Sequence, residues 1–226
     1  MMSKLVRGSI VALAAFAALA AVPAHAGTAP ALVGSATQVH DSIQLTQRFG
    51  QGQSGAAWQT EAVSLTKSFQ VRFSFSLHGG TFPQADGIAF VIQTDGPAAL
   101  GNLGGGGGLG FDGLHGVGSV IQTYTNNRLG LAVDGDPYNA KAAPGDLGDS
   151  SSITGTEVVA YDAVNHVLSM QGRISVDGTS YDVSDSAAVD LQSLLGTDTA
   201  TIGFTGATGD NTSSQVISKV NFKYTN

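Results

Sequence analysis

Apolar and polar residues alternate along much of the chain, which is the pattern of strands that bury one face. The clearest example is Phe69 to Leu77, where Phe, Val and Leu at every second position are separated by Gln, Arg and Ser. The segment Val216 to Tyr224 repeats the pattern near the C-terminus, with Ser218 as the one polar member of its apolar side. The run Ile88 to Ile92 is wholly apolar, which is typical of a strand buried on both faces.

Shorter segments of the same kind follow at close intervals, separated by Gly, Asp and Asn. Such a series predicts an all-β fold, a sandwich or jelly roll of antiparallel sheets. One or two helical turns are expected within Ala187 to Leu195, where Val and Leu are loosely spaced. Further strands are expected at about residues 43–46, 118–125, 129–134, 156–161, 167–171, 173–176, 180–183 and 201–205.

Residues 1–26 have the features of a secretory signal peptide. A short basic head with Lys4 and Arg7 precedes an apolar stretch too short for a comfortable membrane span, and Ala24-His25-Ala26 matches a cleavage site. We therefore expect an exported protein, secreted or periplasmic, without a membrane span after the leader is removed. The remaining residues, 27–226, have the length of one all-β domain.

Composition narrows the classes of partner. Without Lys4 and Arg7 the chain has 8 basic and 17 acidic residues, a net charge of −9 with His neutral. This balance argues against binding to nucleic acid or to anionic lipid. The chain has no Cys, so the core must hold without disulfides, which a domain of this size can do.

The stretch Gly80 to Asn127 gathers the polar groups that a ligand site needs. Asp86 stands at the mouth of the buried apolar run, where a charge must be solvated or paired. The glycines at 104–108 have no side chains, so a ligand can approach their backbone N–H groups closely. Tyr124 and Asn126 add an aromatic face and an amide that both donates and accepts. Together these groups suit a ring that bears hydroxyls.

Each of these residues also has a purely structural interpretation, and the residues alone leave both open. Asp86 precedes Gly87, a pair that commonly forms a turn. The run of glycines could be only a flexible loop, and Tyr124 could be a packing residue. Asn126 and Asn127 lie between two expected strands and would make a good hairpin turn.

Six motifs occur in the same order as those of a known family. They are Gln53-Ser54-Gly55-Ala56-Ala57-Trp58, Phe69 to Leu77, Ala85-Asp86-Gly87-Ile88-Ala89-Phe90, Gly106-Gly107-Gly108-Leu109-Gly110, Val117 to Asn126 with Arg128 to Gly135, and a C-terminal set from Val189-Asp190-Leu191 through Ile202 to Gly209 to Val220-Asn221-Phe222. In this order they resemble the legume-type (L-type) lectin domain over nearly all of residues 27–226. With the leader, the resemblance predicts a bacterial, secreted variant of that domain.

The resemblance implies a concanavalin A-like jelly-roll sandwich of two large antiparallel sheets, with the sugar site on loops at the curved sheet. Matched residue by residue, Asp86 would accept hydrogen bonds from two sugar hydroxyls, and Gly107 would donate its backbone N–H. Asn126 would bond a hydroxyl, and Tyr124 would stack on the sugar ring. The implied activity is carbohydrate binding without catalysis.

The resemblance also assigns specificity to the loop at residues 208–211, which contains Asp210 and Asn211. The implied partner is a glycan or glycoconjugate. Pairing of two copies through the flat back sheet into a homodimer is a further expectation, because this fold often pairs in that way.

The resemblance breaks down at the metal ligands. Family members that bind calcium and a transition metal use acidic residues and a histidine where this chain has Val120, Gln122 and Arg128. No acidic residue occurs at 113–133, and calcium needs several oxygen ligands, so we expect no metal cofactor. The family's metals hold a cis peptide bond before the residue equivalent to Asp86. Here either other contacts, such as Arg128 in place of the cation, hold that segment, or the site is weak.

Two other functions are compatible with a jelly-roll architecture. A glycosidase of the same architecture needs two clustered glutamates about 5 to 5.5 Å apart, whereas Glu61 and Glu157 are each isolated, so we expect no enzyme. A structural or adhesive surface protein that kept the fold and lost sugar binding is the main alternative. Residues 108–113 match the glycine fingerprint of dinucleotide-binding proteins, but a strand and not a helix is expected after them, so we treat the match as chance. The acidic stretch 134–139 is expected to be a turn and not a calcium loop.

Overall fold

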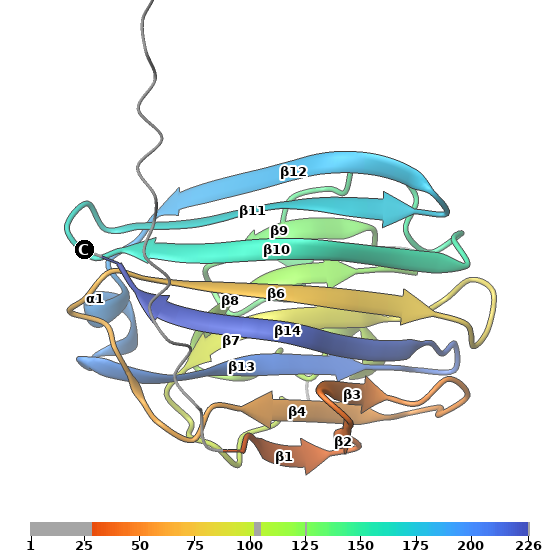
Figure 1. Cartoon of the computed structure of the whole chain (residues 1–226), viewed down its shortest axis with the longest axis horizontal. Coiled ribbons are helices and arrows are strands. Elements are labelled where there is room, and N and C mark those ends of the chain that lie inside the picture. Colours follow the sequence, from red (N-terminus) through yellow and green to blue (C-terminus); the bar gives the residue numbers. More distant parts are fainter. Residues whose placement is uncertain (1–28, 102–104, 125, 226) are drawn as a thin grey trace, which may run out of the picture.

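The computed structural model describes residues 29–101, 105–124 and 126–225. The predicted signal peptide lies outside these residues. Two seven-stranded antiparallel sheets lie face to face (Figure 1). This arrangement confirms the predicted all-β jelly-roll sandwich. Among the described residues, no helix has the length and apolar character needed to cross a membrane.

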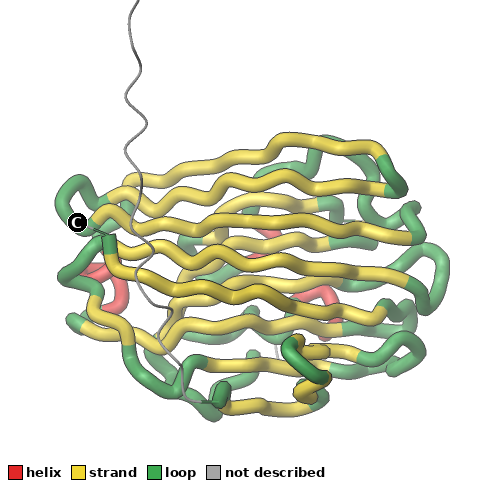
Figure 2. The backbone as a smooth tube through the Cα atoms, viewed as in Figure 1, coloured by secondary structure: helices red, strands yellow, loops and turns green. Residues whose placement is uncertain are grey.

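We call the two sheets the front sheet and the back sheet. The front sheet contains, in spatial order, β1 (Ala31–Gly34), β4 (Ser54–Trp58), β13 (Thr199–Ala207), β7 (Gly87–Gln93), β8 (Gly116–Gln122) and β9 (Arg128–Ala132), with β5 (Val63–Ser64) paired to β13. The back sheet contains β12 (Thr179–Ala188), β11 (Val167–Val176), β10 (Ser152–Asp162), β6 (Phe69–His78), β14 (Ser214–Tyr224), β3 (Ser42–Thr46) and β2 (Thr37–Val39). The helical turns are short (Figure 2): η1 (Gly105–Gly108), η2 (Pro137–Asn139) and α1 (Leu191–Leu195).

The core lies between the sheets and follows the predicted alternation. Every second residue of β6, from Phe69 to Leu77, is buried, while the residues between them face outward. Phe73 of the back sheet meets Phe204 of the front sheet edge to face, with ring centroids 4.8 Å apart. All seven residues of β7 are buried, as the apolar run predicts, because a second apolar cluster covers the other face of the front sheet. This cluster includes Trp58, Leu109 and Phe111.

Several predicted boundaries were wrong. The two strands expected at 167–171 and 173–176 form the single strand β11, since Gly172 continues the pairing with β10 and β12. The helical turns expected within residues 187–195 are confirmed by α1, which begins at Leu191 because residues 187 and 188 still pair within the back sheet and Asp190 caps the helix. The sequence analysis missed β1, β2, β4 and β5. Strand β4 is buried along most of its length and is made mostly of small residues, so it has no alternation to recognise.

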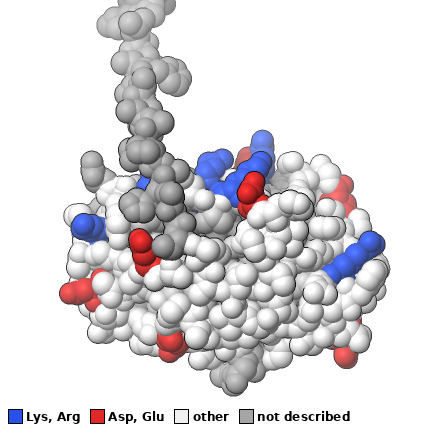
Figure 3. Space-filling model, turned by 60° about the horizontal axis from the view of Figure 1, so that its bottom comes forward, with Lys and Arg blue, Asp and Glu red and all other residues white. Residues whose placement is uncertain are grey.

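Charged side chains are sparse on the surface of the molecule. On the face shown in Figure 3, most of the surface belongs to residues other than Lys, Arg, Asp and Glu; some charged side chains gather at the upper centre and the rest stand apart. The Arg173 and Asp182 side chains form an exposed ion pair of 2.9 Å on the back sheet. Such a pair in contact with water adds little to stability.

A carboxyl group is buried in the core without a charged partner among the described residues. Glu157 of β10 is 2% exposed, and its Oε1 has no hydrogen-bond partner among the described residues. Burial raises the pKa of Glu157 from 4.5 to about 7, and only the Ser119 hydroxyl of β8 acts in the opposite direction. The folded protein therefore holds this proton more tightly than the unfolded chain does.

We predict that Glu157→Gln stabilises the protein in a pH-dependent way. The folded pKa is the higher one, so the wild type has the full benefit of the protonated carboxyl below pH 4.5 and loses it as the pH rises to about 7. At about 1.4 kcal/mol per pKa unit, the variant should gain about 3 kcal/mol over the wild type above pH 7 and almost nothing at pH 4. Urea unfolding of residues 27–226 at several pH values measures this difference. Glu61→Gln, at an exposed position, is the control, and a pH-independent gain in Glu157→Gln would refute the assignment.

Candidate functional site

Loops from both sheets meet at one end of the sandwich, at the right of Figure 1. Strands β3, β6, β8 and β13 all finish at this end, which brings together segments that are far apart in the sequence. The segments are residues 47–53, 79–86, 105–108, 123–127, 146–150 and 208–213. We call them the site loops.

Asp86 lies just before β7, at the boundary between the core and the site loops. The residue is only 7% exposed, and its Oδ2 has no hydrogen-bond partner among the described residues. Burial raises the pKa of the Asp86 carboxyl from 3.8 to about 6, while the nearby backbone N–H of Gly209 acts to lower it. A buried carboxylate with an unused acceptor gains free energy from a ligand that donates hydrogen bonds to it.

Hydrogen bonds hold the backbone around Asp86. The Ala85–Asp86 peptide bond is cis. Thr123 donates its N–H to the Asp86 carbonyl (2.7 Å) and its hydroxyl to the Gln84 carbonyl (3.1 Å). The Ser213 hydroxyl donates to the Ala85 carbonyl (3.0 Å). Both hydroxyl bonds are buried, so competing water is excluded from them.

A further loop reinforces this segment from the other side. The Gln84 amide donates to the Ser150 hydroxyl (2.8 Å). The Asn127 amide donates to the Asp146 carboxylate (2.9 Å), and its oxygen accepts from the Leu147 N–H (2.7 Å). Loop 146–150 is thereby attached both to the segment before Asp86 and to the hairpin that contains Asn126.

The metal positions of the family do not fit a cation in this chain. Val120 packs in the apolar cluster over the front sheet, and the Gln122 amide donates to the Gly107 carbonyl (2.5 Å). Arg128 is half-buried, and no hydrogen bond joins it to residues 84–86 within the described part of the chain. Neutral donors, and not Arg128, bond the backbone carbonyls at residues 84–86. The alternative that the site is weak stays a prediction.

Two glycines of η1 lie directly against site side chains. A Cβ atom on Gly106 would collide with Oδ2 of Asp86 and would lie 2.5 Å from the Gly209 nitrogen. A Cβ atom on Gly107 would collide with the Tyr138 hydroxyl. The glycine backbone therefore closely approaches side chains of the site. The expected close approach of a ligand to the same backbone stays a prediction. Of the two, Gly106 is the glycine that faces Asp86, whereas the resemblance assigned the ligand contact to Gly107.

Tyr124 and Asn126 lie in the β8–β9 hairpin of the site loops. Tyr124 projects its ring partly into solvent, and its backbone packs tightly against Gly148. Asn126 is half-buried, and its side chain makes no hydrogen bond to the residues that the structure describes. The structural role in this turn falls to Asn127, which has a φ of +46° and holds loop 146–150. This division leaves the Asn126 amide available to a ligand.

The two residues expected to set specificity differ in their surroundings. Asp210 is exposed, and its backbone carbonyl accepts from the Gln51 amide (2.9 Å). The Asn211 amide donates to the Pro83 carbonyl (2.7 Å), so it already supports the loop before Asp86. Gly209 lies beside Asp86, with its Cβ position 3.4 Å from Oδ2.

Sequence reasoning missed Tyr138. The stretch 134–139 is a turn, as expected, in which the Asp136 carboxylate accepts from the Tyr138 N–H (2.8 Å) at the start of η2. This turn places the Tyr138 hydroxyl against Gly107. Burial raises the pKa of Tyr138, and the negative charges of Asp112, Asp86 and Asp136 raise it further. No motif marks this residue, because only the fold brings η2 to η1.

The two glutamates cannot form a catalytic pair. Glu157 lies in the core between the sheets, and Glu61 is exposed in the turn before β5. Within the described residues, no group of three or more His, Cys, Asp or Glu side chains could hold a metal ion.

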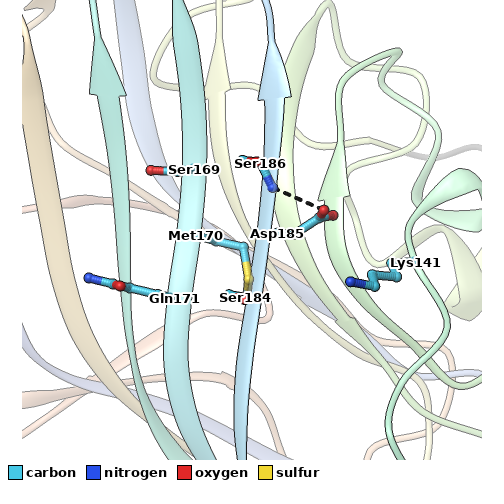
Figure 4. Close-up of a pocket in the computed structure, with 7 residues that line it drawn as sticks. All are labelled: Lys141, Ser169, Met170, Gln171, Ser184, Asp185 and Ser186. Carbon is cyan, nitrogen blue, oxygen red and sulfur yellow. Dashed lines mark hydrogen bonds between the residues drawn. The ribbon is translucent and has the colours of Figure 1, made fainter.

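A separate hollow of about 470 Å³ lies beside β11 and β12 (Figure 4). Its Asp185 carboxylate accepts from the Ser186 N–H and, across the sandwich, from the Leu131 N–H of β9, each at 3.0 Å. The hollow shares no residue with the site loops, and its Asp185 carboxylate serves to join the two sheets. Its lining residues are Lys141, Ser169, Met170, Gln171, Ser184, Asp185 and Ser186.

The two sheets form a jelly roll of the legume lectin type. The fold is similar to the seed lectin of Lotus tetragonolobus, with a TM-score of 0.73, 19% identity and coverage of 87% of this chain and 93% of that one. It is also similar to arcelin-5, a lectin-like defense protein from Phaseolus vulgaris (TM-score 0.70, 19% identity, 89% and 94% covered). A lectin from Bauhinia forficata in complex with GalNAc gives a TM-score of 0.67 at 22% identity, with 90% and 96% covered. Neither family models nor curated sequences match the chain.

We predict that Gly106→Ala disturbs the site while Gly209→Ala does not. The new Cβ at 106 meets Asp86 and backbone atoms of the 208–209 segment, whereas the one at 209 makes an ordinary contact of 3.4 Å. Overpacking of this kind costs about 1–3 kcal/mol of unfolding free energy. Urea unfolding of the two variants tests the difference, and equal stabilities would show that η1 does not pack on Asp86.

Proposed function

We propose that the protein is a secreted or periplasmic lectin that binds a glycan through the site loops, without catalysis and without the family's metals. One observation carries the proposal: a buried carboxylate, Asp86, with an unused acceptor oxygen lies beneath the glycine backbone of η1. Asn126 and Tyr124 add an unengaged amide and a partly exposed ring nearby. Acceptor, amide and aromatic face are the groups that hold a hydroxylated ring. The GalNAc complex of the Bauhinia lectin, which shares the fold, supports the same class of ligand.

A second candidate is a structural or adhesive protein that has kept the fold and lost sugar binding. Its support is that Gly106 covers Oδ2 of Asp86 and that the Asn211 amide is already bound to Pro83. A ligand therefore reaches Asp86 only from the side that Gly106 leaves open. The two candidates differ in whether Asp86 can be reached, which a binding experiment decides.

We predict that the mature protein, residues 27–226, is retained on a glycan array in EDTA and that Asp86→Asn removes the retention. The amide cannot accept two strong hydrogen bonds as the carboxylate does, so the affinity should fall by about 100-fold or more. The unfolding free energy should not fall, and above pH 6 it should rise, because burial raises the pKa of the carboxyl that the amide replaces to about 6. Asp182→Asn, on the exposed face of β12, is the matched control and should bind as the wild type does. Absence of binding by the wild type in EDTA and with added calcium and manganese would favour the second candidate. Binding only with added metal would show that the ligand positions were misassigned.

We also predict that glycan affinity depends on pH. The ligand requires the ionised carboxylate, and the pKa of Asp86 in the free protein is about 6. Affinity should therefore be constant above pH 7 and fall below pH 6, by up to about tenfold per pH unit. Calorimetric titrations with the strongest array ligand between pH 4.5 and 8 measure the profile. An affinity that stays constant across this range would mean that Asp86 does not contact the ligand as a carboxylate.

A further inference from the structure

The site loops expose two phenylalanine rings that the proposed sugar contacts do not use. Phe49, in loop 47–53, and Phe82, in loop 79–86, are each 71% exposed. Of the described large apolar side chains, only Val164 is more exposed, at 82%, and it lies in the β10–β11 turn at the opposite end of the sandwich (Figure 1). An exposed Phe has no polar group to hydrate, so two of them beside a binding site point to a ligand.

Buried Thr212 holds the two phenylalanine-bearing loops together. Its N–H donates to the Thr81 hydroxyl (2.8 Å), and its own hydroxyl donates to the Arg48 carbonyl (2.9 Å). Phe82 directly follows Thr81, and Phe49 directly follows Arg48. The backbones that carry the two rings are therefore fixed to one residue, so the two exposed rings extend from neighbouring, hydrogen-bonded loop segments.

The same 208–213 segment connects these rings to the Asp86 site. At one end of the segment, Gly209 lies beside Oδ2 of Asp86. Further along, the Asn211 amide bonds to the Pro83 carbonyl, next to Phe82. The 208–213 segment thus contacts both the proposed sugar site at Asp86 and the loop that carries Phe82.

The surroundings of the rings favour a carbohydrate over a lipid surface. The Arg48 guanidinium lies over one face of the Phe49 ring, 5.0 Å from the ring centroid, and supplies hydrogen-bond donors beside it. The loops that carry the rings contain no other Lys or Arg, and the acidic residues Asp86 and Asp210 are close by. The electrostatic attraction that binds proteins to anionic membranes is therefore absent from this part of the described chain. Separate apolar rings among polar groups match the alternating C–H faces and hydroxyls of linked sugars.

We infer that Phe49 and Phe82 form a second subsite, which stacks on a further sugar ring of an oligosaccharide whose first ring occupies the Asp86 site. This inference rests on the proposed lectin function. The preferred ligand is accordingly an oligosaccharide of two or more sugars, and a monosaccharide fills only part of the site.

The test compares short and long glycans. The mature wild type, Phe49→Ala, Phe82→Ala and the double variant are screened on an array that carries monosaccharides, including galactose and GalNAc, together with oligosaccharides that end in the same sugars. Loss of the two stacking contacts should weaken the wild type's best oligosaccharide by about tenfold and leave binding of its terminal monosaccharide unchanged. Val164→Ala, an exposed apolar truncation at the far end, should change neither.

Other outcomes separate the failure of the subsite from the failure of the lectin proposal. An equal loss for monosaccharide and oligosaccharide, or no loss for either, overturns the second subsite while the lectin function stands. Failure of the wild type to bind any glycan overturns both. If the wild type sediments with phosphatidylcholine vesicles and the double variant does not, the rings serve a lipid surface and the subsite is overturned.

Discussion

The site end of the molecule depends on one constraint, which is that the Asp86 carboxylate is kept out of water where the core meets the loops. An ionised group in that position tolerates few neighbouring side chains. An apolar side chain that filled the remaining space beside it would leave the charge without a hydrogen-bond donor. This explains why bare backbone at Gly106 and Gly209 surrounds it. It also explains why Thr123 and Ser213 hold the adjoining carbonyls, since a shift of the backbone would move the charge into the core.

Neutral groups organise these loops. Amides and hydroxyls, such as Gln84 with Ser150, occupy the interior of the site loops around Asp86, and the other charged residues of these loops are exposed. Hydrogen bonds between uncharged, buried groups are directional and are not screened by salt, so the loops can be shaped without an ion at their centre. The conformation of the site loops depends instead on the hydrogen-bond geometry of a few neutral side chains.

The sequence predicted those parts of the fold in which the period of the pattern is visible. Strand β6 alternates and was located to within one residue, and Asp86 was correctly placed at the mouth of a buried strand. Strand β4 has no such period because both of its faces are buried. Tyr138 could not be found, since its place beside Gly107 arises from the packing of η2 on η1 and not from any local motif. In the same way, the resemblance drew attention to Asn211 but not to the carbonyl that its amide binds.

The bond between Asp185 and Leu131 affects how the protein can associate with itself. Strand β9 is the last strand of the front sheet, and a free margin of this kind normally offers a row of unpaired backbone groups to any other chain. Here the Leu131 N–H is already taken by Asp185, and the backbone at 141–143 occupies groups of Leu129 and Asn127. This sheet edge is therefore a poor template for the addition of further strands, side by side, from other chains. At this margin, a contact with another chain would depend on side chains, so a partner would be chosen by sequence and not by the backbone.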